Sequence, residues 1–144
     1  MAVNVFSNPI NGPASITNRG VLTNDVELTA NSTEIQRMDA GAGARKIQLP
    51  NPALCLDRVF EISNISSTNT LAVYQYNATA FGGAVIPLPG VAGGTLQTGT
   101  SVAVSAGTTP AITTASGTPK YTSARYFCDG TTWLLLSATP NPIY

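Results

Sequence analysis

Residues 125–136 read Arg125-Tyr126-Phe127-Cys128-Asp129-Gly130-Thr131-Thr132-Trp133-Leu134-Leu135-Leu136. Two runs of β-favouring residues meet at an Asp-Gly pair, a pattern that predicts a two-residue hairpin turn in which both central residues take positive φ. With such a turn, Cys128 faces Thr131 and Tyr126 faces Trp133 across the ribbon. We therefore expect a β-hairpin near the C-terminal end of the sequence.

Both faces of this hairpin carry large apolar side chains. Strand alternation puts Trp133 and Leu135 on one face, and Leu134 and Leu136 on the other. Because neither face suits water, the hairpin is expected either in the core or at a contact between subunits. The residues assigned to this hairpin are Tyr126, Phe127, Trp133, Leu134, Leu135 and Leu136.

The composition of the 144-residue chain fits one domain that is large enough to bury a core. Seven acidic and seven basic side chains give a formal net charge of zero, so the basic face of a nucleic-acid-binding protein is not expected. The sequence contains neither a secretory signal nor an apolar run long enough to span a bilayer. We expect a soluble protein that is made in a cytoplasm and has no membrane partner.

Short strands separated by turn signals are expected along most of the chain. Their predicted ranges are 26–28, 34–38, 45–50, 58–64, 70–76, 85–88, 101–105 and 111–114. A single helical turn is expected at residues 52–55, and strands 58–64 and 70–76 are expected to form a second hairpin with a longer loop. Without any 3.6-residue periodicity, the pattern predicts an all-β fold, an antiparallel sandwich or a jelly-roll-like barrel.

Residues 1–24 are expected to form an extended N-terminal arm, and residues 25–144 a single β domain. Turn clusters at residues 8–9, 11–13 and 18–20 interrupt the short apolar pieces of this arm, so the arm cannot build a core alone. Two alternatives stay open: the arm pairs with the edge of its own sheet, or it lies on a neighbouring molecule.

The middle of the chain is unusually poor in charge, because no charged residue lies between Glu61 and Lys120. Charges normally guard sheet edges, so a charge-free, β-prone surface is an aggregation hazard in a free monomer. Burial in an oligomer or on a larger lattice removes that hazard. The alternative is a surface rich in Thr and Ser that stays soluble without a partner.

The inventory of reactive side chains argues against an enzyme. The chain has no histidine, which removes the commonest general base and the usual transition-metal ligand. A glycoside hydrolase needs two carboxylates facing each other across a cleft. Asp129 is better explained as a turn residue, Asp39 as part of a loop, and Glu61 as the polar face of a strand. No catalytic residue and no cofactor is expected.

Two further groups could serve as sites, and each has a simpler interpretation. Asp25 and Glu27 share a strand face and could help to hold calcium, but two carboxylates are more simply solvated surface charge, and no metal is expected. Cys55 and Cys128 lie far apart in sequence without a neighbouring ligand. We interpret them as small buried apolar residues in a reducing compartment, and whether they ever pair is left open.

Exposed tyrosines could serve a different class of function, a carbohydrate-binding β-sandwich. Tyr74 and Tyr76 share a face of one predicted strand, and Tyr121 lies on another segment. Aromatic pairs on one strand face more often pack in a core than stack on a sugar. Core packing is therefore the preferred interpretation, and glycan binding the alternative.

Three segments occur in an informative order. They are Lys46-Ile47-Gln48-Leu49-Pro50, Asp57-Arg58-Val59-Phe60-Glu61-Ile62-Ser63-Asn64 and Asp129-Gly130-Thr131-Thr132-Trp133. This order resembles a pattern of tailed-bacteriophage virion proteins: a strand ending in Leu-Pro, a Gly-Arg-x-hydrophobic-x-Ile-x-Asn strand, and a closing Asp-Gly-Thr-x-Trp hairpin. The chain departs from the pattern at Asp57, where glycine is usual, so the turn there is expected to be built differently.

The resemblance covers about residues 45–136 and is to the small β domains of capsid decoration (cement) proteins and of head and tail fibres, which are typically homotrimeric. It implies a virion structural protein on the capsid surface, made in the host cytoplasm, which binds the major capsid protein and stabilises contacts between its subunits. The alternative is a short head or tail fibre or spike domain that binds a host surface glycan.

In this setting the N-terminal arm is expected to reach the capsid or a neighbouring subunit. The residues assigned to this contact are Val5, Phe6, Ile10, Ile16, Arg19 and Val21. The hairpin of residues 125–136 is expected in the core or near the three-fold contact. The matched motifs make the fold, and the resemblance transfers no catalytic residue.

Overall fold

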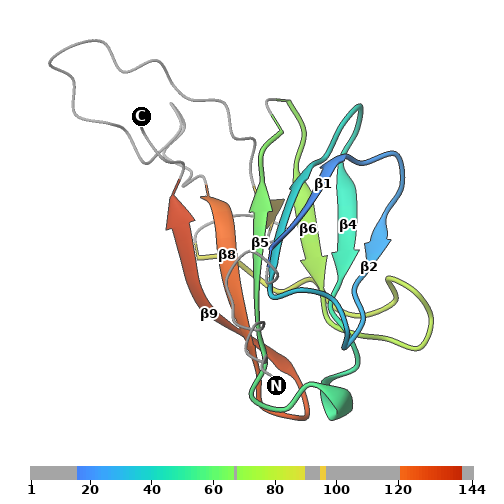
Figure 1. Cartoon of the computed structure of the whole chain (residues 1–144), viewed down its shortest axis with the longest axis vertical. Coiled ribbons are helices and arrows are strands. Elements are labelled where there is room, and N and C mark those ends of the chain that lie inside the picture. Colours follow the sequence, from blue (N-terminus) through green and yellow to red (C-terminus); the bar gives the residue numbers. More distant parts are fainter. Residues whose placement is uncertain (1–15, 67, 90–94, 97–120, 141–144) are drawn as a thin grey trace, which may run out of the picture.

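The computed structural model describes residues 16–66, 68–89, 95–96 and 121–140. Its strands are β1 (Ile16–Val21), β2 (Val26–Glu27), β3 (Ile35–Asp39), β4 (Arg45–Gln48), β5 (Val59–Asn64), β6 (Leu71–Tyr74), β7 (Thr95–Leu96), β8 (Tyr121–Cys128) and β9 (Trp133–Pro140). Within these ranges the helical element is one short 3-10 turn, η3 (Pro52–Leu54), at the predicted place (Figure 1). The all-β class is confirmed, while the strands predicted at 101–105 and 111–114 lie outside the described residues.

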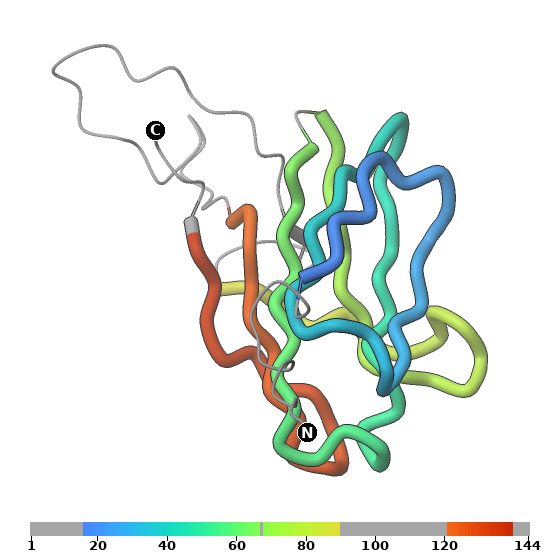
Figure 2. The backbone as a smooth tube through the Cα atoms, in the orientation of Figure 1, coloured from blue at the N-terminus to red at the C-terminus, as the bar shows by residue number. Residues whose placement is uncertain are grey.

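The strands form two sheets, and the chain passes between them repeatedly. Sheet A has the order β1-β3-β5-β8-β9, and sheet B has the order β2-β4-β6-β7. From β1 to β6, each strand lies in the opposite sheet from the one before it (Figure 2). Neighbours within β1-β3-β5 and within β2-β4-β6 are parallel. This part of the chain is therefore wound in successive turns, with the connectivity of a short parallel β-solenoid.

The predicted antiparallel arrangement holds for only part of the fold. The antiparallel pairs among the described strands are β5–β8, β6–β7 and β8–β9. The expected hairpin of residues 58–64 and 70–76 is wrong, because β5 pairs with β3 and β8 whereas β6 pairs with β4 and β7. A parallel neighbour has to come from a different turn of the winding, and the loop between β5 and β6 instead carries the chain from sheet A to sheet B.

Side chains from both sheets meet in one hydrophobic core. Its largest fully buried members include Trp133, Tyr126, Phe60, Met38, Ile47, Leu49, Ile62, Leu71 and Val73. The predicted alternation in β5 is confirmed, because Phe60 and Ile62 are buried and Glu61 and Ser63 lie on the other face. The rings of Phe60 and Trp133 are 5.5 Å apart at a tilt of 59°, a geometry that aromatic pairs favour.

The described part of the predicted arm, residues 16–24, contains β1, which is the edge strand of sheet A and pairs with β3. Of the two alternatives for this segment, pairing with its own sheet is thus the one seen. Ile16 and Val21 are exposed, and Arg19 donates from Nε to Oε1 of Gln36 at 2.7 Å. Residues 1–15, with Val5, Phe6 and Ile10, lie outside the described residues, so the boundary at residue 24 stays a prediction.

Candidate interaction surface

The turn between β8 and β9 differs from the prediction. It spans four residues, with the Asp129 amide donating to the Thr132 carbonyl at 3.2 Å. Asp129 Oδ1 accepts the backbone N–H groups of Thr131 and Thr132, both at 2.8 Å. These two hydrogen bonds, from Thr132 and Thr131, lower the pKa of the Asp129 carboxyl. Gly130 has a φ of 91°, whereas Asp129 is not among the residues with positive φ, so the expected two-residue turn is wrong.

The longer turn moves the register by two residues and so leaves the predicted faces intact. Cys128 pairs with Trp133 and Tyr126 pairs with Leu135. A shift by two keeps every side chain on its face, whereas a shift by one would exchange the faces. Trp133 is 1% exposed, and its Nε1 donates to the Pro50 carbonyl at 2.8 Å. The inner face of the hairpin therefore lies in the core, which was one of the two places expected from the sequence.

The outer face of the hairpin is different. In register, Val59 of β5 pairs with Phe127 of β8, which pairs with Leu134 of β9. Val59 and Phe127 are half-buried, Leu134 is 47% exposed, and the nearby Leu136 is 56% exposed. We call these four residues the outer patch. It is an apolar row across three strands of sheet A, on the face turned away from the core.

A β-bulge shapes the end of the outer patch. Arg125 pairs with Ser137 and Tyr126 pairs with Leu135, so Leu136 is the extra residue between two paired neighbours. Bulges bend the strand and redirect the side chain that they insert. Here the inserted side chain is a leucine that stays largely exposed.

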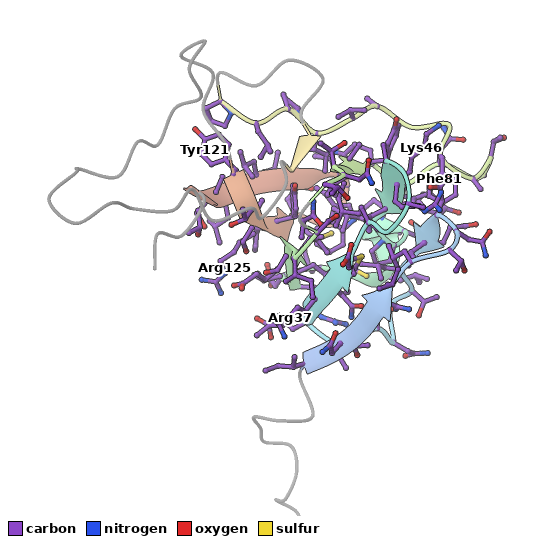
Figure 3. The ribbon with its side chains drawn as sticks, turned by 90° about the horizontal axis from the view of Figure 1, so that it is seen from above. Arg37, Lys46, Phe81, Tyr121 and Arg125 are labelled. Carbon is purple, nitrogen blue, oxygen red and sulfur yellow. The ribbon has the colours of Figure 1, made fainter. Side chains whose placement is uncertain are left out.

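Charged side chains border the outer patch on sheet A. Arg125 Nε lies 3.6 Å from Glu61 Oε2, and both side chains are partly exposed, so this ion pair contributes about 0–1 kcal/mol to stability. Arg37 of β3 is exposed on the same side of the molecule (Figure 3). Lys46 and Phe81 lie on the opposite side, over sheet B (Figure 3). The outer patch therefore has a polar border, as protein interfaces commonly do.

Both cysteines are buried and free, as predicted for small apolar residues. Burial raises the pKa of the Cys55 thiol, against the opposing effect of Arg58. Burial also raises the pKa of the Cys128 thiol, whose Sγ donates to the Pro52 carbonyl at 3.4 Å. Thiols of raised pKa are poor nucleophiles at neutral pH.

Tyr126 carries a polar atom that sequence reasoning did not single out. Its side chain is fully buried between the sheets, and no partner for its hydroxyl is found within the described ranges. Burial raises the pKa of this phenol far above its ordinary value of 10.0. Tyr126 is a buried member of the core, so we assign its hydroxyl no binding role.

The tyrosines considered for glycan binding differ in their surroundings. Tyr74 lies beneath Lys46 Nζ, 5.6 Å from its ring centroid, and makes an edge-on contact with Phe81 at 6.5 Å. Tyr76 is exposed, and Tyr121 packs partly against the core. The Tyr74 ring is thus engaged within the chain, and no observation favours sugar binding at this face.

The loop that contacts Tyr74 is held by a buried amide. Gln48 Oε1 accepts the Phe81 backbone N–H at 2.7 Å, and Gln48 Nε2 donates to the Asn77 carbonyl at 3.2 Å. Phe81 has a φ of 59°, which is uncommon for a bulky residue. The hydrogen bonds from Gln48 hold the loop over sheet B, and they account for a buried polar side chain that the sequence alone did not explain.

The calcium candidate finds no support in the geometry. Asp25 Oδ1 accepts the Lys46 backbone N–H at 2.8 Å, and both Asp25 and Glu27 are exposed. Among the residues with described positions, no group of three or more Cys, Asp or Glu side chains could hold a metal ion. Over the same residues, no helix is long and apolar enough to cross a membrane.

Comparisons with protein-family models, curated proteins and solved structures found no match to this chain. The case for a function therefore rests on the residues themselves, on the outer patch and on the motif resemblance of residues 45–136.

Proposed function

We propose that this protein is a virion structural protein, a capsid decoration (cement) protein. It binds the outside of the assembled capsid as a homotrimer and stabilises contacts between major capsid subunits. The observation that carries the proposal is the outer patch, an apolar row across β5, β8 and β9 with two leucines about half exposed. A contiguous apolar area with a polar border is typical of a protein–protein contact.

The low charge of the chain supports the same proposal. Between Glu61 and Lys120 no side chain is charged, so this part of the sequence lacks the charges that protect a free β protein from association. In a trimer the outer patch of one copy is covered by its neighbour. The two faces of the hairpin then have separate tasks: the inner face holds the fold together, and the outer face holds the subunits together.

Attachment to the shell acts through mass action. A protein that binds only the assembled shell stabilises that state by RT ln(1 + [L]/Kd). Three linked copies raise the effective concentration of the second and third contacts, so weak individual contacts suffice. We further propose that the two sheets form a sandwich with an N-terminal arm, residues 1–24, that follows the capsid or a neighbouring subunit.

Co-sedimentation tests this function. Purified protein is mixed either with shells assembled from the major capsid protein or with the same subunits dissociated, and each mixture is centrifuged. We expect the protein to pellet with the shells, to saturate at a fixed ratio, and to raise the temperature at which the shells fall apart. Protein that stays in the supernatant with assembled shells contradicts the proposal.

A further inference from the structure

We propose that the end of the molecule formed by η3 and the β8–β9 turn is the surface that docks onto the capsid shell, in an apolar recess bordered by lysine or arginine. This inference rests on the proposed function and adds the contact that the arm alone does not supply. We call this end the leucine tip and define it by Leu54, Leu56, Asp57 and Asp129. Figure 1 shows η3 and the β8–β9 turn together at one end of the molecule.

The two leucines of the tip are unusually exposed. Leu54 is 70% exposed and Leu56 is 64% exposed, and Leu54 has the largest value among the large hydrophobic side chains whose burial is described. A single exposed leucine is ordinary. Two leucines separated by one residue on a short loop form a compact apolar projection, which water solvates poorly and a concave partner can cover.

Backbone hydrogen bonds fix the shape of this projection. The Leu54 amide donates to the Asn51 carbonyl at 3.0 Å, and the Cys55 amide donates to the Pro52 carbonyl at 3.0 Å. The Arg58 amide then donates to the Cys55 carbonyl at 2.9 Å, closing a turn around Leu56. Because the loop is already ordered, docking it costs little additional conformational entropy.

The tip is also attached to the hairpin. The Asp57 amide donates to the Cys128 carbonyl at 3.0 Å. A Cβ atom added at Gly130 would lie 3.1 Å from Cδ1 of Leu56, so the Leu56 side chain rests against the β8–β9 turn. The loop that carries the leucines is therefore held against the turn that carries Asp129.

Asp57 explains how this turn is built where the family pattern has glycine. Its φ is 62°, in the left-handed region that glycine adopts freely and that Asp tolerates better than most residues. Asp57 thus takes a conformation that is open to glycine and adds an exposed carboxylate beside Leu56. A residue that accepts this conformation and also brings a charge is consistent with a contact role.

The charges of the tip define the partner. Asp57 and Asp129 are both exposed, and both border Cys128: the Asp57 amide donates to the Cys128 carbonyl at 3.0 Å, and Asp129 directly follows Cys128 in the chain. The adjacent cation, Arg58, donates from Nη1 to the Ala30 carbonyl at 2.8 Å and from Nη2 to the Ser32 carbonyl at 3.1 Å. Its guanidinium is therefore held by the β2–β3 connection, and the tip presents leucines with an acidic border. Charge complementarity points to a basic border on the partner.

A variant series tests the docking surface. Leu54→Ser and Leu56→Ser each remove one exposed apolar group, and we expect either to lower shell affinity about tenfold or more, as truncation of a central contact does. Ile65→Ser is the matched control: Ile65 is 38% exposed and directly follows β5, whereas the tip precedes it, so the shell affinity of this variant should equal that of the unmodified protein. Circular dichroism and light scattering establish that each variant keeps its fold and its mass.

A second pair of variants tests the charges. Asp57→Asn and Asp129→Asn remove charge but keep side chains that tolerate the same turns, and Asn at 129 still offers Oδ1 to the two backbone N–H groups. We expect the double variant to bind shells more weakly at low salt and to lose most of the salt dependence of binding.

The outcomes separate the inference from the proposed function. If the unmodified protein does not pellet with shells, the proposed function and the docking surface are both contradicted. If it pellets and the Leu54, Leu56 and Asp variants pellet equally well, the function stands and the docking surface is overturned. If the leucine variants change the mass of the protein in solution, the tip is a contact between copies of this chain, which also overturns the inference.

Discussion

The two faces of the β8–β9 hairpin both carry large apolar side chains, but they differ in how far these side chains are buried. Trp133 and Tyr126 on the inner face are fully buried, whereas Leu134 and Leu136 on the outer face are about half exposed. The inner side chains are covered by the opposite sheet and by β5, and within the chain nothing described covers the outer ones as fully. Apolar character alone therefore does not distinguish a core face from an interface face. The distinction depends on whether another part of the same chain covers the side chains.

The largest loss of folding free energy is expected when a side chain of the inner face is truncated. Trp133→Ala should cost about 3–5 kcal/mol of folding free energy, because it removes the largest fully buried side chain of the core and leaves a cavity. It also frees the Pro50 carbonyl that accepts from Nε1. Urea unfolding monitored by circular dichroism measures the change. A loss below about 1 kcal/mol would mean that the inner face is not the core.

Alkaline pH should lower the free energy of unfolding, because three buried groups titrate there. Burial raises the pKa of Cys55, Cys128 and Tyr126 in the folded protein, so above their ordinary pKa values the unfolded chain loses protons that the folded chain keeps. Stability is then fully present below the ordinary cysteine value of 9.0 and falls as pH rises beyond it, with a further fall above 10.0 for the tyrosine. Unfolding curves between pH 7 and pH 11 check this, and a flat profile would contradict the burial of all three groups.

The unpaired hydroxyl of Tyr126 allows a finer test of the same face. Tyr126→Phe removes a buried polar atom without a partner in the described structure and keeps the ring, so stability should rise by about 1 kcal/mol. The same variant should lose only the additional fall in stability above pH 10 that Tyr126 causes, and it should keep the fall that the cysteines cause, which serves as its internal control. A clear loss of stability at neutral pH would show instead that the hydroxyl makes a hydrogen bond.

The smallest effect on folding is expected at the outer face. Leu134→Ser and Leu136→Ser should each change the unfolding free energy of the monomer by less than about 0.5 kcal/mol, as surface substitutions usually do. Dilute samples, in which subunits dissociate, give the relevant comparison with Trp133→Ala. A loss comparable to that of Trp133→Ala would erase the distinction between the two faces.

Residue alternation predicted the face on which each side chain lies better than it predicted which residues and which strands pair. The inner positions of β5 and β8–β9 follow from period-two patterns, and they survive a change of register because the Asp129 turn lengthened the loop by an even number of residues. The turn itself was mispredicted because the Asp129 carboxylate binds two backbone N–H groups, a local hydrogen bond that competes with the two-residue turn.

The sequence did not predict which sheet each strand belongs to, because strand pairing depends on contacts between residues far apart in the chain. β5 and β6 are consecutive in the chain, and the loop between them fits a hairpin as well as a passage between sheets. The wound part of the fold has a structural repeat without a sequence repeat, since the loops that connect its strands differ in length. The leucine tip was likewise not predicted, because the sequence does not show that the side chains of Leu54 and Leu56 are exposed.

The solution mass of the purified protein, measured by light scattering beside its Leu134→Ser/Leu136→Ser double variant, tests most directly whether the outer patch joins subunits. The chain mass is 14.9 kDa. We predict that the unmodified protein has three times this mass and that the folded double variant has the mass of one chain. An unmodified protein that stays at 14.9 kDa, or a double variant that keeps the trimer mass, would contradict the assignment of the outer patch to a trimer contact.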